Sequence, residues 1–413
     1  MLRILHTADW HLGHQLHGVS RHYEHQQFLN WLLETLKSNQ ADALIVAGDI
    51  FDSANPPAAA QAQLYNFLVK ARTALPGLSI ILVGGNHDSA SRLDAPSPIL
   101  NALGVEVVGG LTRSEEGNID WNRLLVPLTN SAGEIRAWCG AMPFLRNADL
   151  PTNNDESDSL IFGMKALYAE LVEQLSQKAG QDESMILTGH CYMVNGAVSE
   201  LSERKILGGN QHALPLELFP NNIAYVALGH LHLAQTVGGN EHIRYSGSPI
   251  PLSFDETDYC HQILQVDIKV NQIPEVTSLK IPRCIDLFRI PNGRDFAPLP
   301  EVIKQLENLA LNDLPIEQRP LLELRIRLDK PEPSLRQQVE EALAQRPIRM
   351  LKISTAYTGS EKSLADIKIE ERLEELQPLD VFERCYQNKY DSHPPEEIKG
   401  LFNQLLESIQ VDE

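Results

Sequence analysis

The stretch Ala43–Asp52, ALIVAGDIFD, is the part of the sequence that decides the fold. Its apolar run is short and ends in Gly48 and Asp49, which is typical of a strand buried on both faces. Apolar residues recur at helical spacing on either side of it, namely Phe28, Trp31, Leu32 and Leu36 before it and Leu64, Phe67, Leu68, Ala71 and Leu75 after it. Alternation of this kind predicts a β-α-β-α-β unit with parallel strands.

Four other apolar runs end in the same way, in a His, Asp or Asn. They lead into Asp9-Trp10-His11, Gly85-Asn86-His87-Asp88, Gly189-His190 and Gly229-His230-Leu231-His232. Because residues that follow the carboxyl ends of strands meet in one crevice of an open α/β sheet, we expect all five endings to converge on one sheet. The set contains carboxylates, imidazoles and a carboxamide but no thiol, which suits a pair of hard or borderline divalent ions. It predicts a two-metal hydrolase.

Each ending taken singly is weak evidence, since a lone His near a strand end is usually a structural residue. The signal is the conjunction of five endings in order, four of them with a glycine directly before the polar residue. Other histidines crowd the N-terminus, namely His6, His14, His17, His22 and His25. Ordinary loop or helix positions are favoured for these, although His14 and His17 could line a substrate entrance.

Length and composition set limits on the class of protein. The chain has 413 residues, which suggests two or three domains, and 43% hydrophobic with 22% charged residues, which is usual for a soluble globular protein. The first residues run straight into a strand and no stretch is long and apolar enough for a membrane helix, so a cytoplasmic location is expected. A net charge of −20 argues against a surface that grips nucleic acid throughout.

The pattern predicts an α/β (α+β) protein in three parts. Residues 1–282 are expected to form two stacked mixed sheets flanked by helices, with 242–246, 261–270 and 275–281 as antiparallel strands that cover the metal-bearing sheet. Residues 283–357 predict a small α+β module. Residues 358–413 predict a helical tail with an apolar stripe, made of Ile398, Leu401, Phe402, Leu405, Leu406 and Ile409.

The order of the five endings resembles that of the calcineurin-like metallophosphoesterases. Three fuller strings are similar to one branch, the SbcD family of nuclease subunits from bacterial SbcC–SbcD complexes; these strings are His6–Gly13, Ala47–Asp52 and Gly247–Phe254. The resemblance implies a two-metal DNA nuclease, with exonuclease activity on double-stranded ends and endonuclease activity on single strands or hairpins, which acts in DNA repair, replication and recombination.

The resemblance also implies roles for individual residues. Two ions are expected, manganese in preference to magnesium, with Asp9, His11 and His232 on one, Asn86, His190 and His230 on the other, and Asp49 between them. His87 would donate a proton to the leaving oxygen or stabilise charge there, and Asp88 would orient His87. A carboxylate suits the bridging place because it can share its charge between two cations.

DNA and a coiled-coil ATPase of the SbcC type are the implied partners, within a heterotetramer that contains a dimer of this chain. The module at 283–357 would cap the cleft and contact DNA, and its candidate phosphate ligands are Arg325, Arg327, Arg346, Arg349 and Lys352. Ordinary solvated charges are an equally good interpretation of these five. The apolar stripe of the tail would dock on the ATPase, or else fold back on its own domain.

Two other functions stay open at this point. One is a related enzyme that cleaves nucleotides or phosphoproteins, although Asp88 and Ser53-Ala54 stand where phosphoprotein phosphatases usually carry Glu and Arg-Gly. The other is a structural subunit whose metals only organise an ATPase assembly; the complete ligand set and His87 speak against it.

Overall fold

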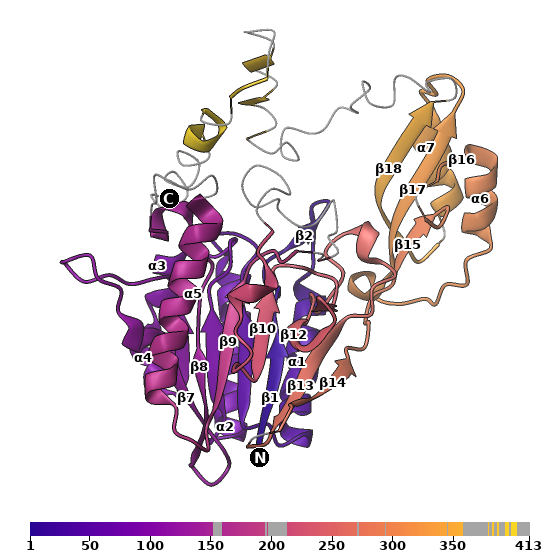
Figure 1. The fold of residues 1–413 in the computed structure, drawn as a ribbon. Helices are drawn as coiled ribbons and strands as arrows, with labels where there is room; N and C mark the ends of the chain where they lie inside the picture. Colours follow the sequence, from indigo (N-terminus) through magenta and orange to yellow (C-terminus); the bar gives the residue numbers. More distant parts are fainter. Residues whose placement is uncertain are drawn as a thin grey trace. The chain divides into compact units, whose positions relative to one another are not determined.

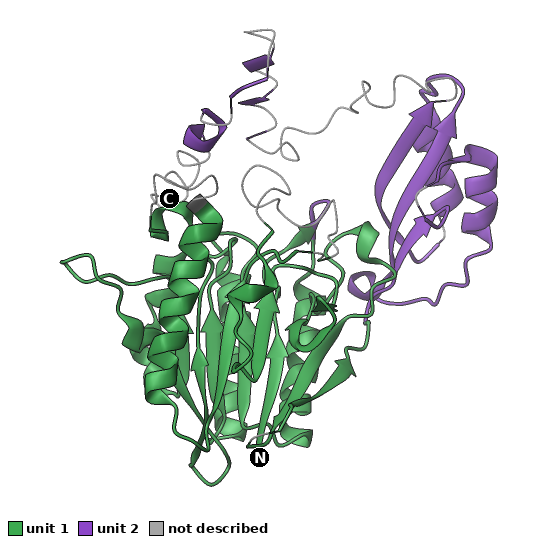
Figure 2. Cartoon of the chain, in the orientation of Figure 1, with its two compact units in different colours: residues 1–15, 20–283 green, residues 16–19, 284–413 purple. Residues whose placement is uncertain are grey.

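The computed structural model describes residues 1–151, 159–194, 196, 213–270, 272–293, 295–344 and 346–357, together with 379, 382–383, 386–387, 393–395 and 398–402 (Figure 1). The chain divides into two compact units (Figure 2). Unit 1 comprises Met1–Gln15 and Ser20–Arg283, and unit 2 comprises Leu16–Val19 and Cys284–Glu413. Most of 358–413 lies outside the described residues, so the separate helical tail stays a prediction.

The first sheet of unit 1 contains the predicted β-α-β-α-β unit. Its strand order is β14 (Glu275–Lys280), β13 (Gln262–Ile268), β1 (Leu2–Thr7), β4 (Ala43–Ala47), β5 (Ser79–Val83) and β6 (Val105–Val108). Strands β1, β4, β5 and β6 are parallel, while β13 runs antiparallel to β1 and β14 antiparallel to β13. The connections include helices α1 (His22–Ser38), α2 (Ala58–Ala74), α3 (Ala90–Asp94) and α4 (Ser97–Ala102).

The second sheet corrects two expectations. Its strand order is β11 (Gln235–Val237), β12 (Asn240–Tyr245), β10 (Tyr225–Gly229), β9 (Ser184–His190), β8 (Ile135–Gly140) and β7 (Leu125–Thr129). The fourth and fifth endings therefore follow strands of a different sheet from the first three, so the five do not share one sheet. Strand β12 pairs parallel to β10 as well as antiparallel to β11, and β13 and β14 extend the first sheet instead of covering it.

The two sheets stack face to face, and β4 contacts β9 and β10. Alternate residues of β4 separate two cores: Ile45 packs between the sheets with Leu187 and Val226, while Leu44 and Val46 face helices α1 and α2. Helix α5 (Ser159–Lys178) covers the second sheet, into which it packs Tyr168, Leu171 and Leu175 (Figure 1). The predicted class, two stacked mixed sheets flanked by helices, is confirmed.

Unit 2 is built around β17 (Leu321–Leu328), which pairs parallel with β15 (Leu287–Ile290), β16 (Ala297–Pro298) and β18 (Arg349–Tyr357). Helices α6 (Leu299–Glu307) and α7 (Leu335–Leu343) cover one face, where Val302, Leu306 and Val339 pack on alternate leucines of β17. A short ribbon joins β2 (Gln15–Leu16) to β3 (Val19–Ser20). Within the described part of the chain, no helix is long and apolar enough to cross a membrane.

Candidate metal centre

Four of the predicted site residues have backbone conformations that L-residues rarely adopt. The φ angles are 54° at Asp9, 46° at His11, 47° at Asp49 and 101° at His230. Backbone hydrogen bonds hold the first two turns together, from Asp9 N to Gly48 O at 3.0 Å and from His11 N to Asp49 O at 3.0 Å. Strained conformations of this kind persist only where the surrounding structure enforces them, and they gather at functional sites.

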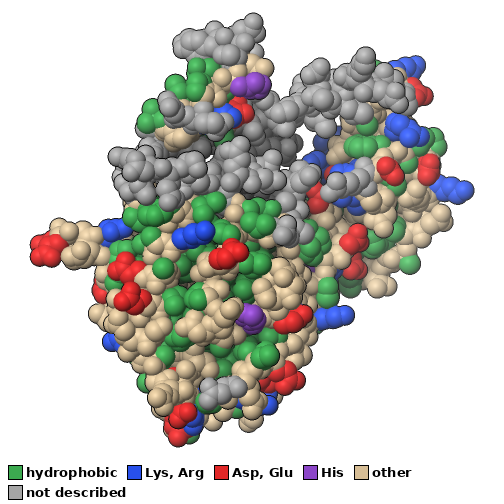
Figure 3. Space-filling view, viewed as in Figure 1, with side chains coloured by type: hydrophobic (Ala, Val, Ile, Leu, Met, Phe, Trp, Pro, Cys, Tyr) green, Lys and Arg blue, Asp and Glu red, His purple; other side chains and the backbone are tan. Residues whose placement is uncertain are grey.

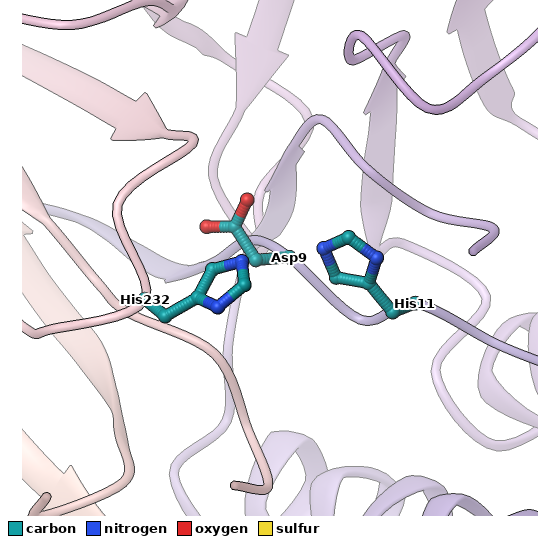
Figure 4. A group of neighbouring side chains, drawn as sticks. All are labelled: Asp9, His11 and His232. Carbon is teal, nitrogen blue, oxygen red and sulfur yellow. The ribbon is translucent and has the colours of Figure 1, made fainter. Parts of the chain in front are cut away.

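Asp9, His11 and His232 form one candidate ligand cluster (Figure 4). One ligand atom from each lies within 4.8 Å of the other two, and all three side chains are buried. Asp9 and His11 follow β1 of the first sheet, whereas His232 follows β10 of the second. The cluster therefore exists only because the two sheets are stacked.

Asp49, His190 and His230 form a second cluster of the same dimensions. The Asn86 Oδ1 atom lies 2.9 Å from His190 Nε2 and 3.1 Å from His230 Nδ1, which places the carboxamide in this cluster too. The Asp49 Oδ2 atom is 3.3 Å from His190 Nε2 and 3.6 Å from His11 Nε2. This carboxylate thus lies between the two clusters.

Hydrogen bonds behind the histidines leave one ring nitrogen of each for a ligand. His190 Nδ1 donates to the Ala47 carbonyl at 3.0 Å, so its Nε2 is the atom available to a cation. His232 Nδ1 is 2.9 Å from Oε1 of Glu256, a carboxylate with no exposed surface. A carbonyl or carboxylate on the far nitrogen is the usual support of a metal-binding imidazole.

Charges in the centre are unbalanced without a cation. Burial raises the pKa of Asp9 to about 7, although the nearby His190 and His232 act in the other direction. Burial would also raise the pKa of Asp49, but the charges of His190 and His87 outweigh it and hold this pKa well below its usual value. Burial would lower the pKa of His190, but Asp49 and Asp9 raise it to about 9.

Two of the imidazoles favour the neutral form that binds metals. Burial lowers the pKa of His11, and burial together with the charge of His190 holds the pKa of His230 well below its usual value. Among the described residues, Asp9 Oδ2 and His11 Nε2 are buried polar atoms without a hydrogen-bond partner. Because such atoms are costly to bury, the donor set fits divalent metal ions.

His87 and Asp88 lie beside the clusters. His87 Nδ1 donates to the Asp52 carbonyl at 2.7 Å, and its ring centroid is 4.6 Å from that of His11. Asp88 accepts hydrogen bonds from the backbone N–H groups of Ile50, Phe51 and Gly85 at 2.9 to 3.0 Å. It therefore ties the second and third turns together, while burial and the charge of Asp49 raise its pKa to about 6.

Glycines make room for these contacts. A Cβ on Gly48 would lie 2.1 Å from His190 Nδ1, and one on Gly229 would lie 1.9 Å from the Ala47 carbonyl oxygen. A Cβ on Gly85 would lie 2.2 Å from Asp49 Oδ1. The glycines are needed because backbone and ligand side chains of the two sheets approach closely.

The candidate DNA-binding residues of unit 2 have different environments. Arg346 donates to the carbonyls of Glu307 and Leu309, and Arg349 to those of Glu317 and Arg319. Arg325 lies over the Phe296 ring with Cζ 5.4 Å from its centroid, Arg327 is exposed and Lys352 is half-buried. On the face shown in Figure 3, Lys and Arg are interspersed with Asp and Glu.

Part of the predicted apolar stripe can be located. The side chains of Ile398 and Leu401 are 40% and 60% exposed, and Phe402 stacks on Phe382 with ring centroids 4.2 Å apart. Leu405, Leu406 and Ile409 lie outside the described residues.

Sequence reasoning overlooked supporting residues around the centre. Asp52 Oδ1 is 3.2 Å from His11 Nδ1 and 3.0 Å from His14 Nδ1, and Glu256 supports His232. The second acidic residue of Gly48–Asp52 was a signal for Asp52. Glu256 lies 24 positions from His232, and no motif links the two in the sequence.

The comparisons with known proteins agree with this geometry. Residues 2–234 match the family model described as calcineurin-like phosphoesterase, and residues 284–390 match one described as type 5 capsule protein repressor C-terminal domain. Relatives named as SbcD subunits of the nuclease SbcCD occur in Rhodobacter capsulatus, 42% identical over 84% of this chain and 86% of the relative, and in Escherichia coli K12, 30% identical over 99% and 98%. The Bacillus subtilis relative is 38% identical over 65% of this chain and 66% of its own. The chain belongs to the SbcD family of calcineurin-like phosphoesterases.

Proposed function

We propose that this chain is the metal-dependent nuclease subunit of an SbcC–SbcD-type complex and hydrolyses DNA phosphodiester bonds. The observation that carries the proposal is the pair of buried ligand clusters with Asp49 Oδ2 between them. Cleavage of double-stranded ends as an exonuclease, and of single strands and hairpins as an endonuclease, is the substrate range that we assign to it in DNA repair, replication and recombination.

Seven residues are assigned as ligands of two divalent ions, with manganese as the preferred metal. Asp9, His11 and His232 hold one ion, and Asn86, His190 and His230 hold the other. Asp49 contributes to both. When bound, a pair of ions of this kind lowers the pKa of a water and stabilises the attacking and leaving oxygens of a phosphate displacement.

His87 is assigned to the leaving oxygen. Because the Asp52 carbonyl can only accept, it fixes the proton on Nδ1 of His87 and leaves Nε2 as the atom that exchanges a proton with substrate. Asp88 contributes by holding the turns of Asp49 and His87 together through three backbone N–H groups. This is an indirect way of orienting His87.

Unit 2 is assigned to DNA binding, as the domain that caps the cleft. Of its five candidates, Arg325, Arg327 and Lys352 are the better supported, because Arg346 and Arg349 donate to carbonyl groups of their own unit. Arg327 is exposed on β17, and the register of β17 with β18 places Lys352 opposite Glu323 on the face that carries Arg325.

An ATPase of the SbcC type is the proposed partner, and two copies of this chain are expected in a heterotetramer with it. Exposed Ile398 and Leu401 support docking of the C-terminal stripe on that ATPase. Removal of all residues from 359 onward should abolish co-purification with the ATPase and spare cleavage of simple DNA substrates by the shortened chain. Co-purification that persists would contradict the docking assignment.

One comparison of substrates tests the nuclease proposal against its rivals. The purified chain with manganese is incubated with labelled hairpin DNA, with a cyclic nucleotide and with a phosphopeptide. Cleavage of the hairpin alone or far above the others supports the proposal. Preference for the nucleotide or the phosphopeptide would indicate another phosphoesterase, and turnover of none would indicate a structural subunit.

A further inference from the structure

Behind the first ligand cluster, a continuous chain of hydrogen bonds joins His11 to His232. His11 Nδ1 lies 3.2 Å from Asp52 Oδ1, which also lies 3.0 Å from His14 Nδ1. His14 Nε2 is 3.0 Å from the Leu252 carbonyl oxygen. The Leu252 N–H donates to Glu256 Oε2 at 2.8 Å, and Glu256 Oε1 lies 2.9 Å from His232 Nδ1.

Both ends of this chain are buried and its middle is not. His11 is 2% exposed and Glu256 is fully buried, whereas the side chains of His14 and Asp52 are 18% and 33% exposed. A carbonyl oxygen can only accept, so His14 Nε2 donates to Leu252. His14 is therefore the residue through which the Asp52 carboxylate is linked to the loop that carries Glu256.

The loop itself is held at a second point from the same N-terminal segment. Arg21, which is fully buried, donates from Nη1 to the Pro251 carbonyl at 2.8 Å and from Nη2 to Glu24 Oε1 at 2.6 Å. Pro251 and Leu252 are thus fixed by two side chains that follow the first ending of the chain. This makes Leu252 a rigid connection, since both its N–H and its carbonyl have partners.

The connection matters because His11 and His232 come from different sheets. Their ring centroids are 5.2 Å apart, and each ring can rotate about its own side-chain bonds unless its far nitrogen is held. Binding a divalent ion needs ligand distances within about 0.2 Å of the preferred value. A shift of one supporting carboxylate relative to the other would move the two ring nitrogens apart.

We propose that His14 is a positioning residue, which couples the two histidine ligands of one metal site through Asp52 on one side and Leu252 with Glu256 on the other. The inference rests on the proposed metal assignment and extends it to a residue outside the ligand set. His14 touches neither ion nor substrate in this role. It acts through the relative placement of His11 and His232.

The test measures manganese binding directly. Titration calorimetry on the metal-free full chain, followed by electron paramagnetic resonance of bound Mn²⁺, resolves two ions and their magnetic coupling. His14→Ala should weaken one of the two ions about 10- to 100-fold, as loss of an outer-shell partner does, and leave the other unchanged. At fixed manganese the coupled-pair signal should then give way to that of a single ion.

Two further variants separate the links. His14→Asn can keep a bond to Asp52 and His14→Gln a bond to Leu252, since their amide nitrogens come near Nδ1 and Nε2 respectively. If coupling is the function, each should also weaken that ion. Combining His14→Ala with Glu256→Gln should cost less than the product of the single losses, because both changes interrupt the same chain.

The matched control is His22→Ala, which removes an exposed histidine of the same segment, and thermal unfolding without metal confirms that every variant is folded. Two ions bound to folded His14→Ala with wild-type affinity, or losses that multiply in the double variant, would overturn the inference. A wild-type chain that binds two ions but cleaves no DNA would overturn the proposed nuclease function and leave the coupling intact.

Discussion

In unit 1, buried carboxylates and imidazoles gather at strand ends and leave atoms such as Asp9 Oδ2 and His11 Nε2 without a hydrogen-bond partner among the described residues. In unit 2, buried charge is satisfied internally: Arg289 pairs with Glu323 at 2.6 Å, and Arg346 and Arg349 donate to carbonyl oxygens. An unsatisfied buried group costs stability, so it persists where a ligand compensates for it. The difference marks unit 1 as the catalytic part and unit 2 as a supporting one.

The largest effect should come from the residue between the two clusters. Asp49→Ala removes a carboxylate shared by both ions, so manganese binding and DNA cleavage should both be lost. Calorimetry and cleavage of labelled hairpin DNA measure the two effects, with Asp182→Ala, an exposed carboxylate of the same unit, as control. Two ions still bound to the variant would refute the shared role of Asp49.

His87→Ala should separate chemistry from metal binding. The side chain is not among the assigned ligands, so two ions should bind as before while kcat falls about 10²- to 10⁴-fold, the usual contribution of a general acid or base. Single-turnover cleavage and manganese titration check this, with His22→Ala as control. Wild-type turnover in the variant would remove His87 from the mechanism.

Acid should weaken unit 1 through histidines that are buried without charge. Burial lowers the pKa of His6 to about 3 and that of His261 to about 4, so the unfolded chain binds their protons near pH 6.5 and the folded chain does not. Their contribution is complete above pH 6.5 and is lost as pH falls. For His6 the loss between pH 7 and pH 4 is on the order of 3 kcal/mol.

Denaturant unfolding of the metal-free chain at pH 7, 5 and 4 measures this loss. His6→Gln, which keeps a polar group near the Tyr225 hydroxyl, should flatten the dependence on pH, whereas His22→Gln should not. Equal pH dependence in the wild type and in His6→Gln would show that His6 does not contribute.

The smallest effects should come from unit 2. Replacement of Arg325 and Arg327 by Ala should weaken DNA binding and reduce the salt slope of log K by about one for each phosphate that the protein no longer neutralises. Metal binding should not change. Arg336→Ala, with a side chain 78% exposed on α7, is the control, and an unaltered slope in the double variant would dismiss both arginines.

The sequence predicted much of the fold because local signals were strong. The apolar run of Ala43–Asp52, the helical spacing around Phe28 and the glycines before the endings all have local causes. The second sheet was misjudged, because short apolar runs do not reveal which sheet a strand joins or its direction. Strand 240–245 therefore appeared antiparallel, although it also pairs parallel with β10.

The polar endings were visible in the sequence, but their support was not. Asp52 and Glu256 act from behind His11 and His232, and His14 connects them through the backbone of Leu252, 238 positions away. Interactions of this kind depend on the stacking of two sheets. No spacing rule connects residues that meet only through tertiary structure.

The most direct test of the central claim is an anomalous-scattering map of crystals of the full chain grown with manganese. Two peaks are predicted in unit 1, one against Asp9, His11 and His232 and the other against Asn86, His190 and His230, with Asp49 in contact with both. A single peak, or two peaks away from these side chains, would contradict the account.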